Sequence, residues 1–373
     1  MKILFITEND ILESVNNGGG QCSKRNLLLL NEIIPEENIH ICVITNNHNH
    51  KMNNQYKSFY YKNNKWYLYL NSFFGRNGYN KKIEKDLIRY IDNLKVDVIF
   101  FDGSSFGGLS NKLMRKYKII TFMQNIELNF TFNRVKHKGL KAIAFLPVCL
   151  SVYYNEYSLL KNSNSIICLN RRDEKLVQKI YKRSPDLIIP ITLNDMFDPE
   201  KKETARNRIK TLLFVGSLFS SNYSGIKWFV ENVMPSVTCQ LIVVGKGMEE
   251  KREELERENV SIIGTVDDLS AYYYQADAVV MPILWGAGMK VKTAEALMFG
   301  KTLFATDEAL EGYEVDNQSG IFRCNTAEDF ILKINEIMSN KSVEKFIPSI
   351  RKIYEENHLT EKYVDALKKI LLR

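Results

Sequence analysis

Short apolar runs alternate with stretches of helical periodicity along the whole chain. One run, Val96–Phe101, is continuously apolar, as in strands that are buried on both faces of a parallel sheet. The expected strands are Lys2–Thr7, Ile39–Thr45, Val96–Phe101, Lys118–Met123, Asn164–Leu169, Leu187–Ile189, Thr211–Val215, Gln240–Val244, Val260–Ile263, Ala278–Met281 and Thr302–Ala305. Strands separated by helices predict parallel sheets that are covered by helices on both sides.

The helical stretches show an apolar period close to 3.6, and glycine or proline lies near several of their ends. The segment Tyr56–Leu70 is rich in aromatic residues and is expected to hold one or two edge strands. The expected helices include Gln21–Ile34 after a Gly18-Gly19-Gly20 turn, Lys81–Leu94, Glu249–Glu258, Leu269–Gln275, Val291–Phe299, Ala327–Met338, Val343–Tyr354 and Thr360–Leu372.

A break in this pattern divides the chain. Asn194–Arg208 is polar and highly charged, contains Pro199, and has no apolar period, so we interpret it as the loop into a second domain. A length of 373 residues suits two domains. The predicted fold class is α/β, with two doubly wound, Rossmann-like domains that face a cleft. The expected domains are 1–193 and 194–354, followed by a helix at 355–373 that could pack back on the first domain.

Composition and charge limit the class of protein. A net charge of +7 fits an anionic substrate or a membrane surface, but it is too weak to indicate a nucleic-acid partner. The six cysteines are scattered without a C-x-x-C pair, which favours buried thiols in a reducing compartment. No apolar run approaches the roughly 18 residues of a spanning helix, and the N-terminus reads as a strand. We therefore expect a cytoplasmic protein.

One glycine-rich turn carries the most specific chemistry. Gly286 and Gly288 lie between the strand at Ala278–Met281 and the helix that starts at Val291, where free backbone N–H groups attract phosphate. Lys292 and Glu295 are three residues apart and share a helix face. A cation for phosphate beside a carboxylate for sugar hydroxyls indicates a nucleotide-sugar site. The alternative is an ordinary helix start with a surface ion pair.

Similar turns recur in a fixed order in the second half of the chain. This part resembles the family-4 glycosyltransferases, bacterial enzymes of the GT-B fold that build polysaccharides, most strongly from Leu212 to Gly320. In the first half, the Gly18-Gly19-Gly20 turn and the Gln124–Glu127 element match more loosely. The series comprises Phe214–Ser217, Gly245–Gly247, Gly264–Asp268, Gly286–Leu297, Gly300-Lys301 and Glu311-Gly312.

The resemblance implies a hexosyltransferase-type enzyme that moves a sugar, with retention, from a nucleoside-diphosphate sugar to a glycan or lipid-linked acceptor. Its first domain would bind the acceptor and its second domain the donor. Glu295 would bind the ribose hydroxyls, Val266 would meet the base through its main chain, and Lys292, helped by Lys290, would neutralise the leaving diphosphate. No metal or other cofactor is expected. The implied donor-binding set is Gly18, Gly19, Gly20, Gly216, Ser217, Val266, Gly286, Gly288, Met289, Thr293 and Glu295.

Candidate acceptor-side residues follow the strands of the first half. Asp102 ends a buried strand and is counted with Lys290 and Lys292 as a catalytic candidate, because it could orient the acceptor. Alternatively it forms the turn before Gly103. Asn125 and Glu127 are candidate acceptor contacts, although Glu127 could equally be a helix-start carboxylate.

The chain also departs from the family pattern. The family usually has two glutamates separated by seven residues, and counting back from Glu295 places Ala287 at the position of the first. Ser217 and Asn222 occupy the place of the usual Arg/Lys pair, and Gln124 that of a histidine. These changes keep two alternatives open, a nucleotide-sugar epimerase of the same fold and a non-catalytic GT-B partner subunit.

A membrane contact is a separate possibility. Ala142–Tyr154 is apolar and follows basic residues, so it could dock on the inner face of an anionic membrane. The alternative is a core helix of the first domain. The basic residues are Arg134, Lys136, Lys138 and Lys141.

Overall fold

The computed structural model divides into two compact units, Met1–Pro190 with Thr360–Arg373, and Ile191–Leu359. The sequence analysis expected divisions at 193/194 and 354/355. None of the described helices is long and apolar enough to cross a bilayer. The structure describes residues 1–9, 11, 18–45, 55–61, 71, 76, 79–136, 145–202, 206–207, 210–286, 288–315, 318–339 and 343–373.

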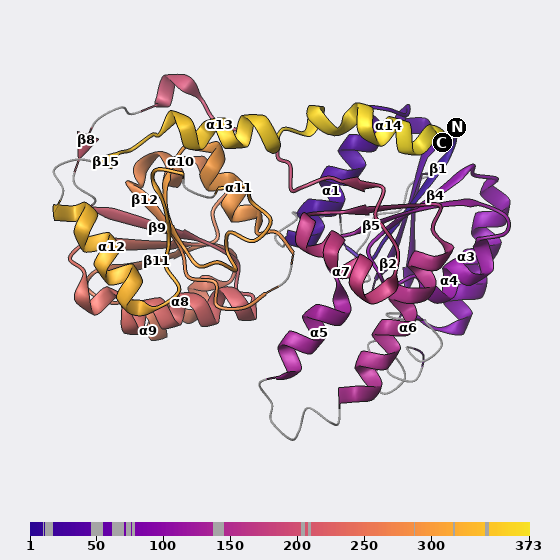
Figure 1. Ribbon diagram of the computed structural model, residues 1–373, viewed down its shortest axis with the longest axis horizontal. Coiled ribbons are helices and arrows are strands. Elements are labelled where there is room, and N and C mark those ends of the chain that lie inside the picture. Colours follow the sequence, from indigo (N-terminus) through magenta and orange to yellow (C-terminus); the bar gives the residue numbers. More distant parts are fainter. Residues whose placement is uncertain are drawn as a thin grey trace. The chain divides into compact units, whose positions relative to one another are not determined.

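The first unit is built on a parallel sheet of seven strands in the order β3-β2-β1-β4-β5-β6-β7 (Figure 1). β1 lies between β2 and β4, so the direction of winding reverses beside it. Polar residues after β1 and β4 therefore lie at a switch point, where doubly wound sheets bind ligands. The strands are β1 (Ile3–Thr7), β2 (Ile39–Thr45), β3 (Tyr56–Tyr60), β4 (Val98–Asp102), β5 (Lys118–Met123), β6 (Ser165–Cys168) and β7 (Leu187–Ile188).

Helices from both ends of the chain cover this sheet. The last one, α14 (Val364–Leu372), packs against α1 (Gly18–Asn31), and the Lys118 ammonium donates to the carbonyls of Ile370 at 3.0 Å and Leu371 at 2.9 Å. The remaining helices are α3 (Lys81–Leu94), α4 (Gly107–Leu113), α5 (Glu127–Lys136), α6 (Leu146–Asn162) and α7 (Arg171–Tyr181).

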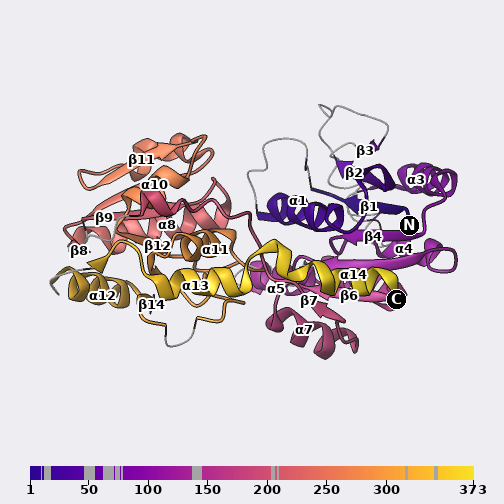
Figure 2. The same ribbon diagram turned by 90° about the horizontal axis from the view of Figure 1, so that it is seen from above.

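The second unit has a parallel sheet of six strands in the order β11-β10-β9-β12-β13-β14. Figure 2 labels β11, β9, β12 and β14 of this sheet. Its switch point lies between β9 (Thr211–Val215) and β12 (Ala278–Met281). The other strands are β10 (Gln240–Val244), β11 (Val260–Gly264), β13 (Thr302–Ala305) and β14 (Ile321–Arg323). The helices are α8 (Ser220–Asn232), α9 (Arg252–Leu255), α10 (Ser270–Gln275), α11 (Val291–Met298), α12 (Ala327–Ser339) and α13 (Pro348–Asn357).

Three local expectations need correction. The glycines 18–20 form the first turn of α1 rather than a separate turn. The charged stretch from Glu249 becomes a 3-10 turn followed by the four-residue α9, because it has little apolar surface to bury. The stretch from Val343 begins as a short strand, Val343–Glu344, paired with Arg206–Asn207, and α13 begins only at Pro348. Proline suits the first helical turn because no N–H is needed there.

Candidate functional site

The glycine-rich turn of the second unit lies at the switch point of its sheet. It joins β12 to α11, and Gly216 follows the neighbouring strand β9. Gly288 has φ 62°, a left-handed conformation that glycine adopts without steric cost, so the chain can turn sharply before α11. The sheet topology therefore brings together two of the predicted segments, Gly216-Ser217 and the turn before α11. Ala287, where the missing glutamate was noted, is outside the described residues.

Gly216 leaves space for the side chain of Lys292. A Cβ at this position would lie 3.0 Å from the Lys292 ammonium and 3.1 Å from the side chain of Asn222. The ammonium donates a hydrogen bond to Oδ1 of Asn222 and lies 5.0 Å from the ring centroid of Phe214. Asn222 in turn donates to the Ser217 carbonyl at 2.9 Å. Lys292 is therefore held against the end of β9 by groups that carry no formal charge.

This setting changes the proton affinity of Lys292. Burial, helped by the positive charge of Lys290 and opposed by the carboxylate of Glu295, lowers the pKa of the Lys292 ammonium to about 7. Near neutral pH the side chain is therefore divided between a charged and a neutral form. A bound anion would favour the charged form of Lys292, because its negative charge stabilises the ammonium.

Glu295 lies on the same helix and is nearly enclosed. Its side chain is buried, and its Oε2 accepts a 2.9 Å hydrogen bond from the Tyr273 hydroxyl. The Tyr273 ring stacks on Phe299 with centroids 4.8 Å apart, which fixes the position of the hydroxyl that donates to Glu295. Burial raises the pKa of the Glu295 carboxyl, whereas the Tyr273 hydrogen bond and the charge of Lys292 oppose that rise.

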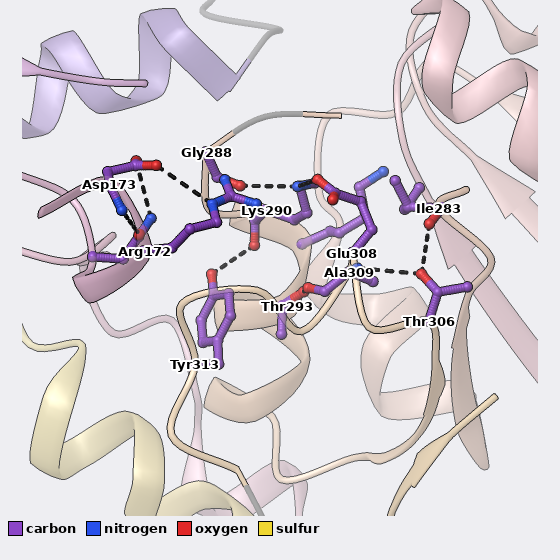
Figure 3. A network of polar contacts seen from close by, with 12 residues as sticks. Arg172, Asp173, Ile283, Gly288, Lys290, Thr293, Thr306, Glu308, Ala309 and Tyr313 are labelled. Carbon is purple, nitrogen blue, oxygen red and sulfur yellow. Dashed lines mark hydrogen bonds and ion pairs between the residues drawn. The ribbon is translucent and has the colours of Figure 1, made fainter. Parts of the chain in front are cut away.

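Lys290 is turned back onto its own loop (Figure 3). Its ammonium donates to the Gly288 carbonyl at 2.8 Å and forms an ion pair with Oε1 of Glu308 at 2.5 Å. The Tyr313 hydroxyl donates to the Lys290 carbonyl at 2.6 Å. Oε1 of Glu308 would be 3.2 Å from a Cβ on Gly286, so this carboxylate lies against the glycine-rich turn itself. The sequence analysis did not include Glu308 or Tyr273 in the site.

Thr293 has a different environment from the one expected of a donor contact. Its side chain is buried, and its hydroxyl donates to the Ala309 carbonyl at 2.7 Å (Figure 3). Thr306 similarly donates to the Ile283 carbonyl at 2.6 Å. The hydroxyl therefore fastens α11, and the assignment of Thr293 to the donor site stays a prediction. Met289 is also buried, so only its main chain could take part in binding.

The turns after β9 and β11 supply the remaining donor-side candidates. Gly216 donates through its N–H to the Val244 carbonyl at 2.9 Å, and Gly245 donates to the Gly264 carbonyl at 2.7 Å. These bonds bring together the ends of strands β9, β10 and β11. Ser217 and Val266 follow two of these ends and are partly exposed, so both remain available to a ligand.

In the first unit, the predicted acceptor-orienting group is enclosed. Asp102 is 1% exposed, and its two oxygens accept hydrogen bonds from Ser23, from Asn26 at 2.6 Å and from Gln124 at 2.9 Å. Burial raises the pKa of the Asp102 carboxyl, against the effect of those bonds. That Asp102 orients the acceptor stays a prediction, and its enclosed carboxyl could do so only through the residues that it holds. It ties α1 and the segment after β5 to the end of β4.

Gly18 and Gly19 remain accessible at the start of α1, whereas Gly20 is buried. A Cβ on Gly19 would lie 3.0 Å from Oδ1 of Asn9 and 3.4 Å from Oε1 of Gln124. Asn9 donates to the Ser23 hydroxyl at 2.9 Å, so this helix start belongs to the same polar group as Asp102.

Glu127 and Asn125 follow β5 and are partly exposed. The N–H of Glu127 donates to Oε1 of the buried Glu156 at 2.7 Å, so Glu156 serves as the carboxylate at the start of α5. Glu8, which the sequence analysis overlooked, follows β1. The residue is exposed to solvent at this end of the sheet. Its only signal in the sequence is its position directly after the first strand.

Part of the chain matches a known protein family. Residues 209–340 match the family model described as glycosyl transferases group 1. No curated protein is similar enough in sequence to count as a match.

The whole chain is similar in fold to solved structures. Sucrose-phosphate synthase from Thermosynechococcus elongatus is 16% identical with a TM-score of 0.73, covering 99% of this chain and 98% of that chain. HepE from Anabaena, solved in complex with UDP, is 12% identical with a TM-score of 0.67, covering 100% and 99%. WaaG, a glycosyltransferase involved in lipopolysaccharide biosynthesis, is 15% identical with a TM-score of 0.62, covering 97% and 95%. The predicted GT-B fold class, with two Rossmann-like units, is confirmed.

Proposed function

We propose that this protein is a glycosyltransferase that moves a sugar from a nucleoside-diphosphate sugar to a glycan or lipid-linked acceptor. The observation that carries the proposal is the placement of Lys292 beside Gly216 at the switch point of the second unit, with Glu295 buried on the same helix. The match of residues 209–340 to group 1 glycosyl transferases supports the same reading. So does the UDP bound by the structurally similar HepE.

In the second unit, each donor group has a partner of matching chemistry. Glu295 would accept hydrogen bonds from the two ribose hydroxyls, a task that suits a carboxylate with two acceptor oxygens. The Val266 main chain would meet the base. The backbone of Gly286, Gly288 and Met289 would approach the sugar and phosphates. We retain Gly18, Gly19 and Gly20 as the expected diphosphate contacts of the first unit.

Lys292 would carry the main catalytic effect. As the anomeric bond stretches, the sugar becomes oxocarbenium-like and negative charge grows on the departing diphosphate. A lysine fixed against β9, with a pKa of about 7, would take up a proton and meet that charge. In a transfer with retention, the departing phosphate itself can accept the acceptor proton, so no protein base is required. No metal is assigned a role.

Glu308 is our candidate for the carboxylate missing at Ala287. It reaches the glycine-rich turn from the segment after β13, and its side chain remains 24% exposed. In this role it would accept hydrogen bonds from the donor sugar, while its partner Lys290 is directed to the phosphates. The ion pair between Lys290 and Glu308 would thus be replaced by one contact of each side chain with the donor.

The first unit would bind the acceptor, with Asn125 and Glu127 as contacts and Asp102 as a positioning residue. Surface-polysaccharide synthesis is the setting that we propose. Six free cysteines, five of them buried, suit the cytoplasm, where thiols stay reduced.

A screen of nucleoside diphosphates tests the donor proposal directly. UDP, GDP, ADP and dTDP are added to the full chain, and thermal unfolding is followed. A diphosphate at 100 times its Kd stabilises by about 2.7 kcal/mol, a shift of roughly 5–10 °C for a domain of this size. The proposal fails if none of the four shifts the transition.

Product analysis then separates the alternatives. Slow release of nucleotide from a nucleotide sugar, abolished in Lys292→Met, supports a transferase. Conversion into an epimeric nucleotide sugar without acceptor would indicate the epimerase. Binding without any turnover by the isolated chain would indicate the non-catalytic subunit.

A further inference from the structure

Helix α6 of the first unit exposes an apolar stripe. Its members recur at helical spacing on one face, and Leu146, Leu150 and Tyr154 are 57%, 58% and 55% exposed. Isolated exposed leucines are common, but five large apolar residues along one helix face are unusual for a monomer surface. We call this surface the α6 stripe; its residues are Leu146, Leu150, Tyr153, Tyr154 and Tyr157.

The opposite face of α6 fixes this orientation. Asn155 accepts from the Gly107 N–H at 2.8 Å and donates to the Ser104 carbonyl at 3.1 Å. Glu156 accepts from the start of α5 and from Tyr181, and Asn162 donates to Asn111 at 2.7 Å. These buried polar groups would lose their partners if the helix rotated, at a cost of about 1–3 kcal/mol for each. The fold therefore directs the apolar face of α6 to solvent and buries its polar face.

The stripe lies on a projecting part of the first unit. Figure 1 shows α5 and α6 extending together from the body of the unit, and the two helices pack against each other. Phe132 on α5 is 61% exposed and adds an aromatic ring to this projection. At the sheet end, Tyr153 stacks on Tyr181 of α7 with centroids 5.5 Å apart, which anchors α6 to the unit.

Positive charge lies where the stripe ends. The Lys161 ammonium is 5.8 Å from the ring centroid of Tyr157, and Arg183 donates to the Lys161 carbonyl at 3.1 Å. Lys182 is exposed just after α7. The one acidic residue of α6, Glu156, is buried on the opposite face, so the exposed face of this fully described helix carries no negative charge.

We infer that the α6 stripe docks on an anionic lipid bilayer. Leucine side chains would enter the boundary of the acyl chains, and tyrosine rings would lie at headgroup depth, where their apolar and polar parts are both satisfied. Lys161, Lys182 and Arg183 would meet the anionic headgroups. A stripe of leucine and tyrosine with basic groups at its end, on a helix whose exposed face carries no negative charge, fits a lipid surface better than a protein partner. Such docking rests on the proposed function for its purpose, which is access to a lipid-linked acceptor.

Vesicle sedimentation tests the inference without donor or acceptor, so it can fail while the transferase proposal stands. The full chain is sedimented with sucrose-loaded vesicles made either of phosphatidylcholine alone or of phosphatidylcholine with about 30% phosphatidylglycerol. Each mixture is tested at low and at high salt, which differ roughly tenfold in ionic strength. Binding should require phosphatidylglycerol and weaken at high salt. Leu150→Glu with Tyr154→Glu should lower the partition coefficient at least about tenfold, and Lys161→Ala about fivefold.

Leu332→Glu is the matched control, because Leu332 is a 68% exposed leucine on α12 of the second unit. It should bind vesicles like the unchanged chain. Leu150→Ser with Tyr154→Ser removes apolar surface without adding charge, and circular dichroism checks that each variant is folded. The inference is overturned if the unchanged chain ignores anionic vesicles, or if the control loses as much binding as the stripe variants. It is also overturned if light scattering shows that the stripe holds two copies together while vesicle binding is unaffected by its loss.

Discussion

The hydroxyl of Tyr273 donates a 2.9 Å hydrogen bond to Oε2 of Glu295. Tyr273 comes from α10 and Glu295 from α11, so the bond joins the helix that precedes β12 in the chain to the helix that follows it. One carboxylate oxygen is thereby occupied and oriented by a ring that is itself stacked on Phe299. The carboxylate is thus held in one orientation before any ligand arrives, which lowers the entropic cost of binding.

Glu295→Ala should weaken nucleoside-diphosphate binding at least about tenfold, because a hydrogen bond to a charged group contributes about 1.5–3 kcal/mol. Tyr273→Phe keeps the carboxylate but removes its orienting donor, and a loss of about fivefold is expected. Isothermal titration calorimetry with the nucleotide found by the thermal screen measures both. Glu328→Ala, an exposed glutamate at the start of α12, is the control. Unchanged affinity in Glu295→Ala would remove Glu295 from the ribose role.

Lys292→Met should lower turnover more than affinity, because the charge that Lys292 meets grows in the transition state. Nucleotide release from the donor gives kcat, and calorimetry gives Kd. Lys352→Met, a lysine on the exposed face of α13, should change neither. Equal losses in kcat and affinity would show that Lys292 contributes to the ground state alone.

The pH dependence of binding offers a second readout for Lys292. The free site has a Lys292 pKa of about 7, and a bound diphosphate favours the charged ammonium. Above pH 7 binding must therefore take up a proton, and Kd should rise by up to about tenfold per pH unit. Below pH 7 this contribution is flat. Lys292→Met should abolish the difference, and a pH slope that survives in this variant would assign it to another group.

Stability should change in the opposite direction. The folded protein holds the Lys292 proton less tightly than the unfolded chain, whose lysine has the ordinary pKa of 10.5. Below about pH 7 this difference lowers the free energy of unfolding by its full amount. The reduction becomes smaller as the pH rises and disappears towards pH 10.5. Lys292→Met should raise the midpoint of thermal unfolding of the ligand-free protein at pH 6, and the gain should shrink at pH 10. A gain independent of pH would contradict the buried-charge explanation.

Glu308→Gln should reduce turnover of the nucleotide sugar by about tenfold or more if the carboxylate holds the donor sugar, since a charged hydrogen bond is replaced by a neutral one. Affinity for the bare nucleoside diphosphate should stay the same or increase, because Lys290 loses its competing partner. Asp307→Asn is the control, since Asp307 is 61% exposed and pairs with Arg323 outside the turn. Equal effects on the nucleotide sugar and the bare diphosphate would mean that Glu308 only shapes the loop.

The sequence predicted the sheets and the position of the site, because these follow from local patterns. Alternating apolar runs and helices placed strands such as β12, and the glycine-rich turn with Lys292 and Glu295 follows it directly. The partners of those residues lie elsewhere in the chain. Tyr273, Glu308 and Asn222 reach the turn only through the tertiary fold, and no spacing rule points to them.

Side-chain direction was the other unpredictable feature. Thr293 and Asp102 stand at positions that suit ligand contact, but both are turned inward to bonds that fasten one element to another. A polar residue at the end of a strand can serve either purpose. Only the packing around it decides which, and packing is set by residues far away in the sequence.

The C-terminal segment that joins the first unit has a consequence for the order of synthesis. Thr360–Arg373 pairs with α1 and with Lys118, but it is translated only after every residue of the second unit. A nascent first unit therefore exposes the surface that α14 later covers for as long as Ile191–Leu359 takes to emerge. Contiguous domains can fold in turn from the ribosome. Here the first unit can gain its last helix only after the second unit has been translated.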